Sequence, residues 1–154
     1  MDPALLEKLR EQSGLRLDRE GRFWHRGGLV EHARTLAVLH RGIHRAPDGR
    51  WATRIGKEWG YLEVEDAALF VRRVEGARAQ LASGEWAEIE SFAIGAGDAL
   101  YARVRGERAR LTRAAQLALA DHLRELPDGA FELDLDGRRW PIARDDGPEP
   151  VRRP

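Results

Sequence analysis

Residues 47–59 read PDGRWATRIGKEW, and residues 127–140 read PDGAFELDLDGRRW. Each stretch opens with a Pro-Asp-Gly turn and continues with an alternation typical of a half-buried strand. The positions of one face match between the two runs: Trp51, Thr53 and Ile55 in the first, Phe131, Leu133 and Leu135 in the second. A Gly-x-x-Trp turn then leads into a returning strand. Each stretch therefore predicts a hairpin, and Asp136-Gly137 is a strong signal for one.

A helical pattern precedes each stretch. Leu36, Leu39 and Ile43 share one face of a helix predicted from about residue 31 to 44. The second helix is expected to be capped by Thr112 and to run to about residue 126, with inward-facing leucines at Leu119, Leu123 and Leu126.

The two helix–turn–hairpin segments align along their length, with one inserted residue before Gly137-Trp140 relative to Gly56-Trp59. The alternative is a chance likeness, because helix–turn–hairpin arrangements are common. Two matching pairs of turns favour an internal duplication. Duplicated units usually pack face to face, so we expect a ligand cleft between them.

Working outward, the sequence predicts an α+β fold made of two diverged copies of a strand–helix–hairpin unit. Each copy should have a mixed or antiparallel sheet and one helix. The expected parts are an N-terminal helix capped by Asp2 (1–14), a first repeat (15–75), a second repeat (76–144) and a flexible polar tail (145–154). Residues 75–85 are interpreted as the junction between the repeats, and Trp140-Pro141 as part of an edge strand, because proline cannot donate to the ladder.

Composition narrows the classes of function. The chain has 154 residues, no cysteine, and 26 basic against 26 acidic side chains. Without cysteine there are no disulfides and no cysteine-ligated zinc, as expected of a cytoplasmic protein. The basic residues are scattered among acids, which argues against nucleic-acid binding. Apolar runs are too short for a membrane helix, so we expect neither a membrane nor a nucleic-acid partner.

Three motifs resemble those of one bacterial family. Residues 18–28 resemble its start, D-G-x-W-x-H-x-G; residues 64–70 resemble V-E-D-A-P-F; and residues 101–113, YARVRGERARLTR, resemble Y-V-R-V-R-G-x-x-E-A-x-x-x-R. The family is that of the domain of unknown function numbered 1285, and the likeness extends over residues 15–143. The sequence departs from the pattern at residues 29–32 and 67–69.

The resemblance implies a duplicated α+β fold whose second half superficially resembles a pleckstrin-homology domain. It also implies a sensing or signalling role, with a nucleotide-like ligand between the halves and no enzymatic activity. It singles out Glu65 and Asp66 of the V-E-D motif for a role beyond solubility.

The residues themselves suggest an anion site. Tyr101, Arg103 and Arg105 alternate on one predicted strand face, and guanidinium groups beside an aromatic ring suit a phosphate or carboxylate on a planar molecule. Arg113, at a helix start, is expected to assist. The predicted ligand site between the repeats is completed by residues of both halves: Trp24, His25, Glu65, Asp66, Tyr101, Arg103, Arg105 and Arg113. The alternative is an exposed, charged sheet face.

Other functions are carried as alternatives. The first is a protein-interaction module, with a partner chain or a second copy docking on the same arginine face or on a sheet edge. The second is an enzyme in which His25 and Glu65 or Asp66 act as acid and base. His40 and His44 have a zinc-like spacing on the predicted helix and His32 lies on the same stripe, but no third ligand is fixed. We therefore predict no metal, no cofactor and no catalytic residues.

Overall fold

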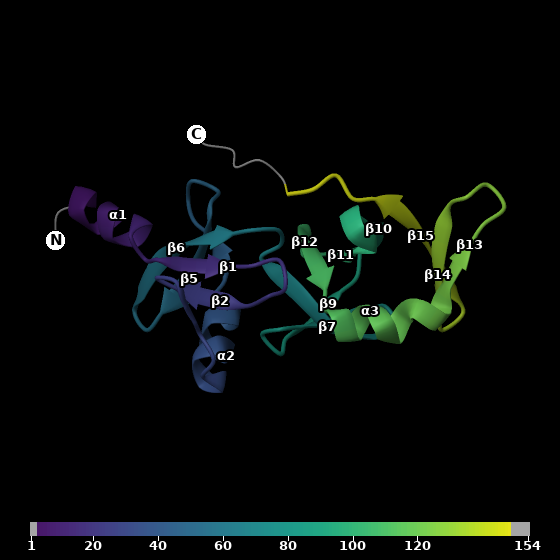
Figure 1. Cartoon of the computed structure of the whole chain (residues 1–154), viewed down its shortest axis with the longest axis horizontal. Coiled ribbons are helices and arrows are strands. Elements are labelled where there is room, and N and C mark those ends of the chain that lie inside the picture. The colour runs from purple at the N-terminus through teal and green to yellow at the C-terminus, as the bar shows by residue number, and fades with distance from the viewer. Residues whose placement is uncertain (1–2, 149–154) are drawn as a thin grey trace. The chain divides into compact units, whose positions relative to one another are not determined.

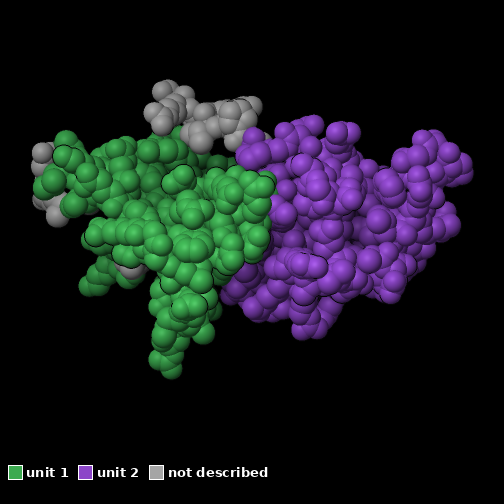
Figure 2. Space-filling view, viewed as in Figure 1, with its two compact units in different colours: residues 1–68, 149–154 green, residues 69–148 purple. Residues whose placement is uncertain are grey.

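The computed structural model describes residues 3–148, which form two compact units. The first comprises residues 3–68 and the second residues 69–148, coloured green and purple in Figure 2. The predicted boundary after Glu75 differs from this division, because Glu75 ends β7, which forms a hairpin with β8 inside the second unit. Asp2, the predicted helix cap, lies outside the described residues.

The first unit holds a six-stranded mixed sheet and two helices. Its elements, in chain order, are α1 (Pro3–Glu11), β1 (Leu15–Leu17), β2 (Phe23–His25), β3 (Gly28–Leu29), α2 (Ala33–Arg41), β4 (His44–Arg45), β5 (Trp51–Ile55) and β6 (Glu58–Val64). The strand order is β3-β2-β1-β6-β5-β4, and β1 runs parallel to β6. Helix α2 packs on β5 and buries Leu39.

The second unit holds a nine-stranded mixed sheet in the order β13-β14-β15-β10-β11-β12-β7-β8-β9. Its elements are β7 (Leu69–Glu75), β8 (Arg78–Leu81), β9 (Trp86–Glu88), β10 (Ser91–Ile94), η1 (Ala96–Asp98), β11 (Leu100–Val104), β12 (Glu107–Leu111), α3 (Arg113–Leu119), η2 (Ala120–His122), β13 (Leu123–Glu125), β14 (Phe131–Leu135) and β15 (Arg138–Arg144). Helix α3 lies along one face of this sheet (Figure 1). The core beneath it includes Phe92, Val104 and Leu133.

The α+β class and both predicted hairpins are confirmed. The two units also share an order of elements: in each, a three-stranded meander leads into a helix and then into three more strands, and the first strand of the meander (β1 or β10) pairs in parallel with the last strand (β6 or β15). The hairpins agree in register, because Thr53 faces Gly60 where Leu133 faces Trp140. Their turns have equal length, so the insertion predicted before Trp140 is wrong.

Several element boundaries differ from the prediction. Helix α2 ends at Arg41, and His44 already begins a strand. Gly42 lies between them, where an added Cβ would stand 2.8 Å from the backbone nitrogen of Arg54, so this close approach requires glycine. Helix α3 ends at Leu119, and Leu123 is an exposed strand residue rather than a core residue. The predicted junction contains β8, whose Ala79 is fully buried.

Strand β15 is central rather than an edge, since it pairs with both β14 and β10. Proline is tolerated at position 141 because the pairing with β10 begins only at Ile142. The first residue of the predicted flexible tail is tied to the sheet, since the N–H of Asp145 donates to the carbonyl of Ile94 at 2.8 Å. Residues 149–154 of that tail lie outside the described residues.

A buried hydroxyl links sheet and helix in the first unit, where Thr53 is fully buried and its Oγ1 donates to the carbonyl of Leu39 at 2.8 Å. We expect Thr53→Val to lower the free energy of unfolding by about 1–2 kcal/mol, because it leaves that carbonyl without its donor. Valine is nearly isosteric with threonine, so no cavity contributes. Urea unfolding followed by circular dichroism measures the change, and an unaltered midpoint would contradict it.

Candidate functional site

The predicted site residues of the first unit meet at the turn between β1 and β2. Asp18, which follows β1, is 4% exposed and accepts four hydrogen bonds at 2.9 Å. The donors are the indole of Trp24, the backbone N–H groups of Glu20 and Arg22, and the Arg22 guanidinium. Burial opposes the ionisation of Asp18, but these bonds outweigh it and lower its pKa to about 2. The carboxylate therefore orders the turn and fixes the ring of Trp24.

Glu65 lies beside this cluster, directly after β6. It accepts hydrogen bonds from the side chain of Arg19 at 2.7 Å and from its backbone N–H at 3.0 Å. These bonds lower the pKa of Glu65 below its ordinary value. The guanidinium of Arg16 stands 3.7 Å from the same carboxylate and 5.4 Å from the ring centre of Trp24. Arg16 thus connects two of the predicted residues, Trp24 and Glu65, and Asp66 follows them half-buried.

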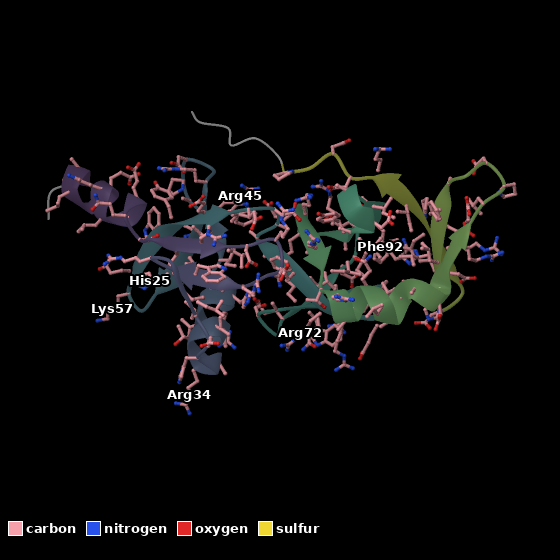
Figure 3. All side chains as sticks on the ribbon, in the orientation of Figure 1. His25, Arg34, Arg45, Lys57, Arg72 and Phe92 are labelled. Atoms are coloured by element: carbon pink, nitrogen blue, oxygen red, sulfur yellow. The ribbon has the colours of Figure 1, made fainter. Side chains whose placement is uncertain are left out.

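His25 does not join this group. It is exposed at the end of β2 (Figure 3) and pairs with Leu15, the first residue of β1. The backbone N–H of Glu65 instead donates to the carbonyl of Leu17, the last residue of β1. The histidine and the carboxylate therefore lie at opposite ends of β1. Neighbouring residues of a strand also point to opposite faces, so Trp24 and His25 do not frame one site. The arrangement does not bring His25 and Glu65 together as an acid and a base.

The histidines with zinc-like spacing are separated as well. His40 packs edge-on against Phe23, with ring centres 4.7 Å apart. His44 lies in the following strand, β4, and its Nδ1 is 2.7 Å from the carbonyl oxygen of Gly42. His32 caps α2 by accepting from the N–H of Thr35. Within residues 3–148 no group of three metal-ligating side chains is found.

In the second unit, Tyr101 and Arg103 share one face of β11, as predicted. The register adds two arginines that sequence reasoning missed: Arg108 opposite Arg103, and Arg110 opposite Tyr101. The Arg105-Gly106 turn was the signal for them, since a two-residue hairpin loop fixes these partners. Arg108 makes two 2.8 Å bonds to Asp145 and stacks 4.0 Å from the ring centre of Tyr101. Both side chains of this ion pair are only 11% exposed.

Arg105 and Arg113 stand apart from that face. Arg105 is the first residue of the turn, with a φ of 53°, rather than a residue of the strand, and it lies 3.5 Å from Glu85. Arg113 begins α3, which packs on the opposite face of the sheet. The predicted place of Arg105 on the strand face of Tyr101 and Arg103 is therefore wrong. Arg113 does begin a helix, as predicted, but on the other side of the sheet from that face.

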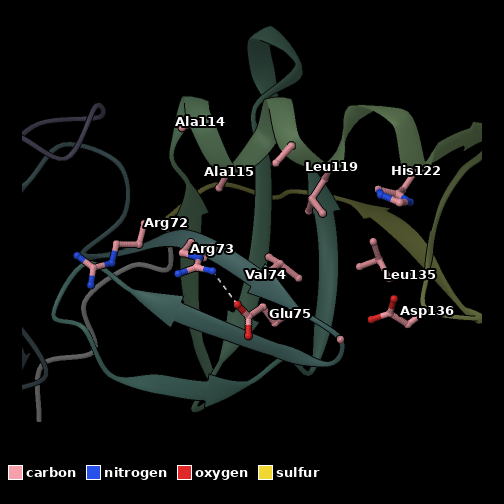
Figure 4. Close-up of a pocket in the computed structure, with 12 residues that line it drawn as sticks. Arg72, Arg73, Val74, Glu75, Ala114, Ala115, Leu119, His122, Leu135 and Asp136 are labelled. Atoms are coloured by element: carbon pink, nitrogen blue, oxygen red, sulfur yellow. Dashed lines mark hydrogen bonds and ion pairs between the residues drawn. The ribbon is translucent and has the colours of Figure 1, made fainter.

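The second unit contains a cleft of about 460 Å³ that the sequence did not reveal (Figure 4). Helix α3 forms one wall with small side chains, Ala114, Ala115 and Ala118, and β7 supplies another part of the lining. The deeper residues Ala115, Leu119 and Leu135 are each no more than 7% exposed, and Val74 packs against the same core. The lining includes none of the eight predicted site residues.

Charged groups surround the apolar part of the cleft. Arg73 forms an ion pair with Glu75 at 2.8 Å, and His122 and Asp136 lie on either side of Leu135 at the other end of the cleft in Figure 4. Arg72 is the extra residue of a β-bulge, because the register passes from Val71 opposite Leu81 to Arg73 opposite Gln80. Bulges commonly redirect side chains beside functional sites. In the part of the chain that the structure describes, no acidic side chain pairs with Arg72.

Fold and cleft together define a two-unit α+β protein with two mixed sheets. The sequence matches no protein-family model and no curated protein. Two solved structures share its fold, and both are described as DUF1285 family proteins. The first, from Silicibacter pomeroyi DSS-3, has a TM-score of 0.64 and 21% identity, and the match covers 87% of this chain and 81% of that one. The second, from Shewanella baltica OS155, has a TM-score of 0.53 and 18% identity, with 71% and 91% covered.

The resemblance inferred from the sequence motifs is thereby confirmed at the level of the fold. The names of these two proteins state no activity or ligand. No helix among residues 3–148 is long and apolar enough to cross a membrane.

The lowered pKa of Asp18 predicts a specific dependence of the free energy of unfolding on pH. Its folded pKa is depressed from 3.8 to about 2, so its contribution is present above pH 4 and is lost as pH falls from about 4 to about 2. We expect Asp18→Asn to lower the free energy of unfolding at pH 7 by roughly 2 kcal/mol and to flatten its pH dependence in this window. Urea unfolding from pH 2 to 7 measures both. Glu20→Gln is the control, and parallel pH curves for the wild type and Asp18→Asn would contradict the prediction.

Proposed function

We propose that the protein binds a small molecule carrying an anionic group, in the cleft between α3 and β7 of the second unit. The observation that carries this proposal is the coexistence of a concave apolar lining and a guanidinium without an acidic partner among the described residues. Small-molecule sites are typically concave and mostly apolar, with a few polar groups that set orientation. A cleft of about 460 Å³ falls within their usual range.

The charges support an assignment for each part of the ligand. Glu75 pairs with Arg73, so we assign recognition of a carboxylate or phosphate to Arg72, whose guanidinium lies at the margin of the lining in Figure 4. The methyl groups of Ala114 and Ala118 are exposed in the free protein and would contact the apolar body of the ligand. This combination favours a small amphipathic anion. The proposal thus keeps the anionic ligand expected from the sequence and assigns it to other residues.

We also infer that the two units arose by duplication, from their shared order of elements and the equal registers of their second hairpins. The likeness of the second unit to a pleckstrin-homology domain stays a prediction. Strand β7, which supplies part of the lining of the cleft, has no counterpart in the strand order of the described part of the first unit. A difference of this kind is consistent with divergence after duplication.

The proposal predicts which changes abolish binding. A thermal-shift screen with nucleotides, sugar phosphates and short-chain carboxylates first identifies the class of ligand. A ligand at 100 times its dissociation constant adds about 2.7 kcal/mol of stability, a shift of several degrees for a chain of this size. We expect Arg72→Ala to weaken binding of the hit about tenfold or more in calorimetry, because a charge-assisted hydrogen bond is lost. Ala118→Leu should block it by filling the cleft.

Each variant has a matched control outside the cleft. Arg139→Ala removes an exposed guanidinium from β15, and Ala120→Leu adds the same bulk to an exposed position of η2. Both should bind the hit like the wild type. A hit that binds Arg72→Ala and Ala118→Leu with unchanged affinity would disprove the site, and a screen without any hit would speak against the function.

A further inference from the structure

The cleft between α3 and β7 carries an acidic side chain at the end away from Arg72. Asp136, in the turn between β14 and β15, belongs to the lining, and Figure 4 shows it on the far side of the cleft from Arg72. Between these two residues Arg73 and Glu75 form their ion pair and neutralise each other's charge. The lining is therefore positive at one end, neutral in the middle and negative at the other.

The carboxylate of Asp136 is not engaged by the protein: among residues 3–148 no side chain or backbone group forms an ion pair or hydrogen bond with it. Arg138, two positions along the chain, instead stacks 3.6 Å from the ring centre of Trp140. One oxygen of Asp136, Oδ2, lies beside the β7–β8 turn, where a Cβ added at Gly76 would stand 3.7 Å from it. Gly76 also lines the cleft, so glycine leaves this side of the carboxylate uncovered.

The geometry of the turn does not account for the negative charge. Asp136 precedes Gly137 and has a φ of 50°, and Arg26 and Arg105 precede glycines with φ values of 49° and 53°. All three pairs form two-residue hairpin loops. The same loop thus accepts a cationic side chain twice in this chain, and an acid at position 136 needs another explanation.

The distance along β7 sets the length of a ligand that reaches both charges. Arg72 precedes Gly76, the neighbour of Asp136, by four positions, and four residues of a strand cover about 13 Å. The flexible side chain of Arg72 bridges part of that distance. An extended chain gains about 1.2 Å per bond, so an eight-carbon ω-amino acid separates its nitrogen from its carboxylate carbon by about 10 Å.

The acidic end suits an organic cation better than a metal ion. His122 is the other polar side chain of the lining at that end, and the structure shows no group of three metal-ligating side chains anywhere in the region it describes. An ammonium group needs fewer partners: it donates to a carboxylate in a charge-assisted hydrogen bond, and a neutral imidazole offers one more acceptor.

We propose that the ligand of this cleft is an amphipathic zwitterion, with its carboxylate or phosphate at Arg72 and a primary ammonium group at Asp136. The inference rests on the function proposed above, because it concerns the same cleft and the same anionic group. It adds the second charge and the order of the parts: anion, apolar chain along the alanines of α3, and cation.

The test compares probes that differ only in a terminal amine: 8-aminooctanoate against octanoate, and 6-aminohexyl phosphate against hexyl phosphate. Calorimetry with the full chain measures their dissociation constants. We expect the amine to tighten binding about tenfold or more, because it adds a charge-assisted hydrogen bond to Asp136. In Asp136→Asn the members of each pair should bind within about twofold of each other. This variant keeps the loop, since Asn-Gly is a favoured pair in it.

Asp121→Asn is the matched control, because it removes a carboxylate from an exposed residue next to His122 that does not line the cleft, and it should retain the gain from the amine. Arg72→Ala should weaken both members of a pair alike. If octanoate binds and Arg72→Ala weakens it, but the amine brings no gain or the gain persists in Asp136→Asn, the zwitterion is disproved and the anion site stands. Absence of binding by all four probes would overturn both proposals.

Discussion

The parallel pairing of β1 with β6, repeated by β10 with β15, is the constraint on which the rest of each unit depends. Parallel neighbours cannot be joined by a tight turn, so the chain between them must leave the sheet and return. In both units it does so through a meander, a helix and a second set of strands. The helix is thereby held against one face of the sheet, and the opposite face is left to arginine and aromatic side chains such as Arg16 with Trp24 and Arg108 with Tyr101.

Local features of the fold were predictable because local chemistry determines them. Asp136-Gly137 adopts positive φ at both residues, as its hairpin requires, and Thr112 caps α3 through the N–H of Ala115. The parallel pairings are long-range and left no local signal, so Pro141 suggested an edge strand although β15 lies inside the sheet. The predicted ends of both helices lay too far along the chain for a similar reason. Gly42, just after α2, approaches the backbone of Arg54 closely, and the local helical pattern gives no sign of that contact.

The residues of the candidate site divide in the same way, into those placed by local patterns and those placed by long-range contacts. Tyr101 and Arg103 were correctly placed on one face by alternation, whereas the bond between Arg108 and Asp145 joins residues from distant parts of the second unit. The cleft was harder still. It requires the alanines of α3, a bulge at Arg72 and the β7–β8 hairpin, and that hairpin lay in the segment interpreted as a junction. Its alternation, with Ala79 and Leu81 buried on one face, was visible in the sequence but obscured by flanking glycines and charges.

One difference between the two described sheets bears on the function proposed for the second unit. Strands β7, β8 and β9 extend the second sheet beyond β12, whereas the described part of the first sheet ends at β3. Of the three added strands, β7 lines the cleft, opposite the small side chains Ala114, Ala115 and Ala118 of α3. A larger side chain at these helix positions would occupy the space between α3 and β7, so the alanines are what leaves room for a small molecule there.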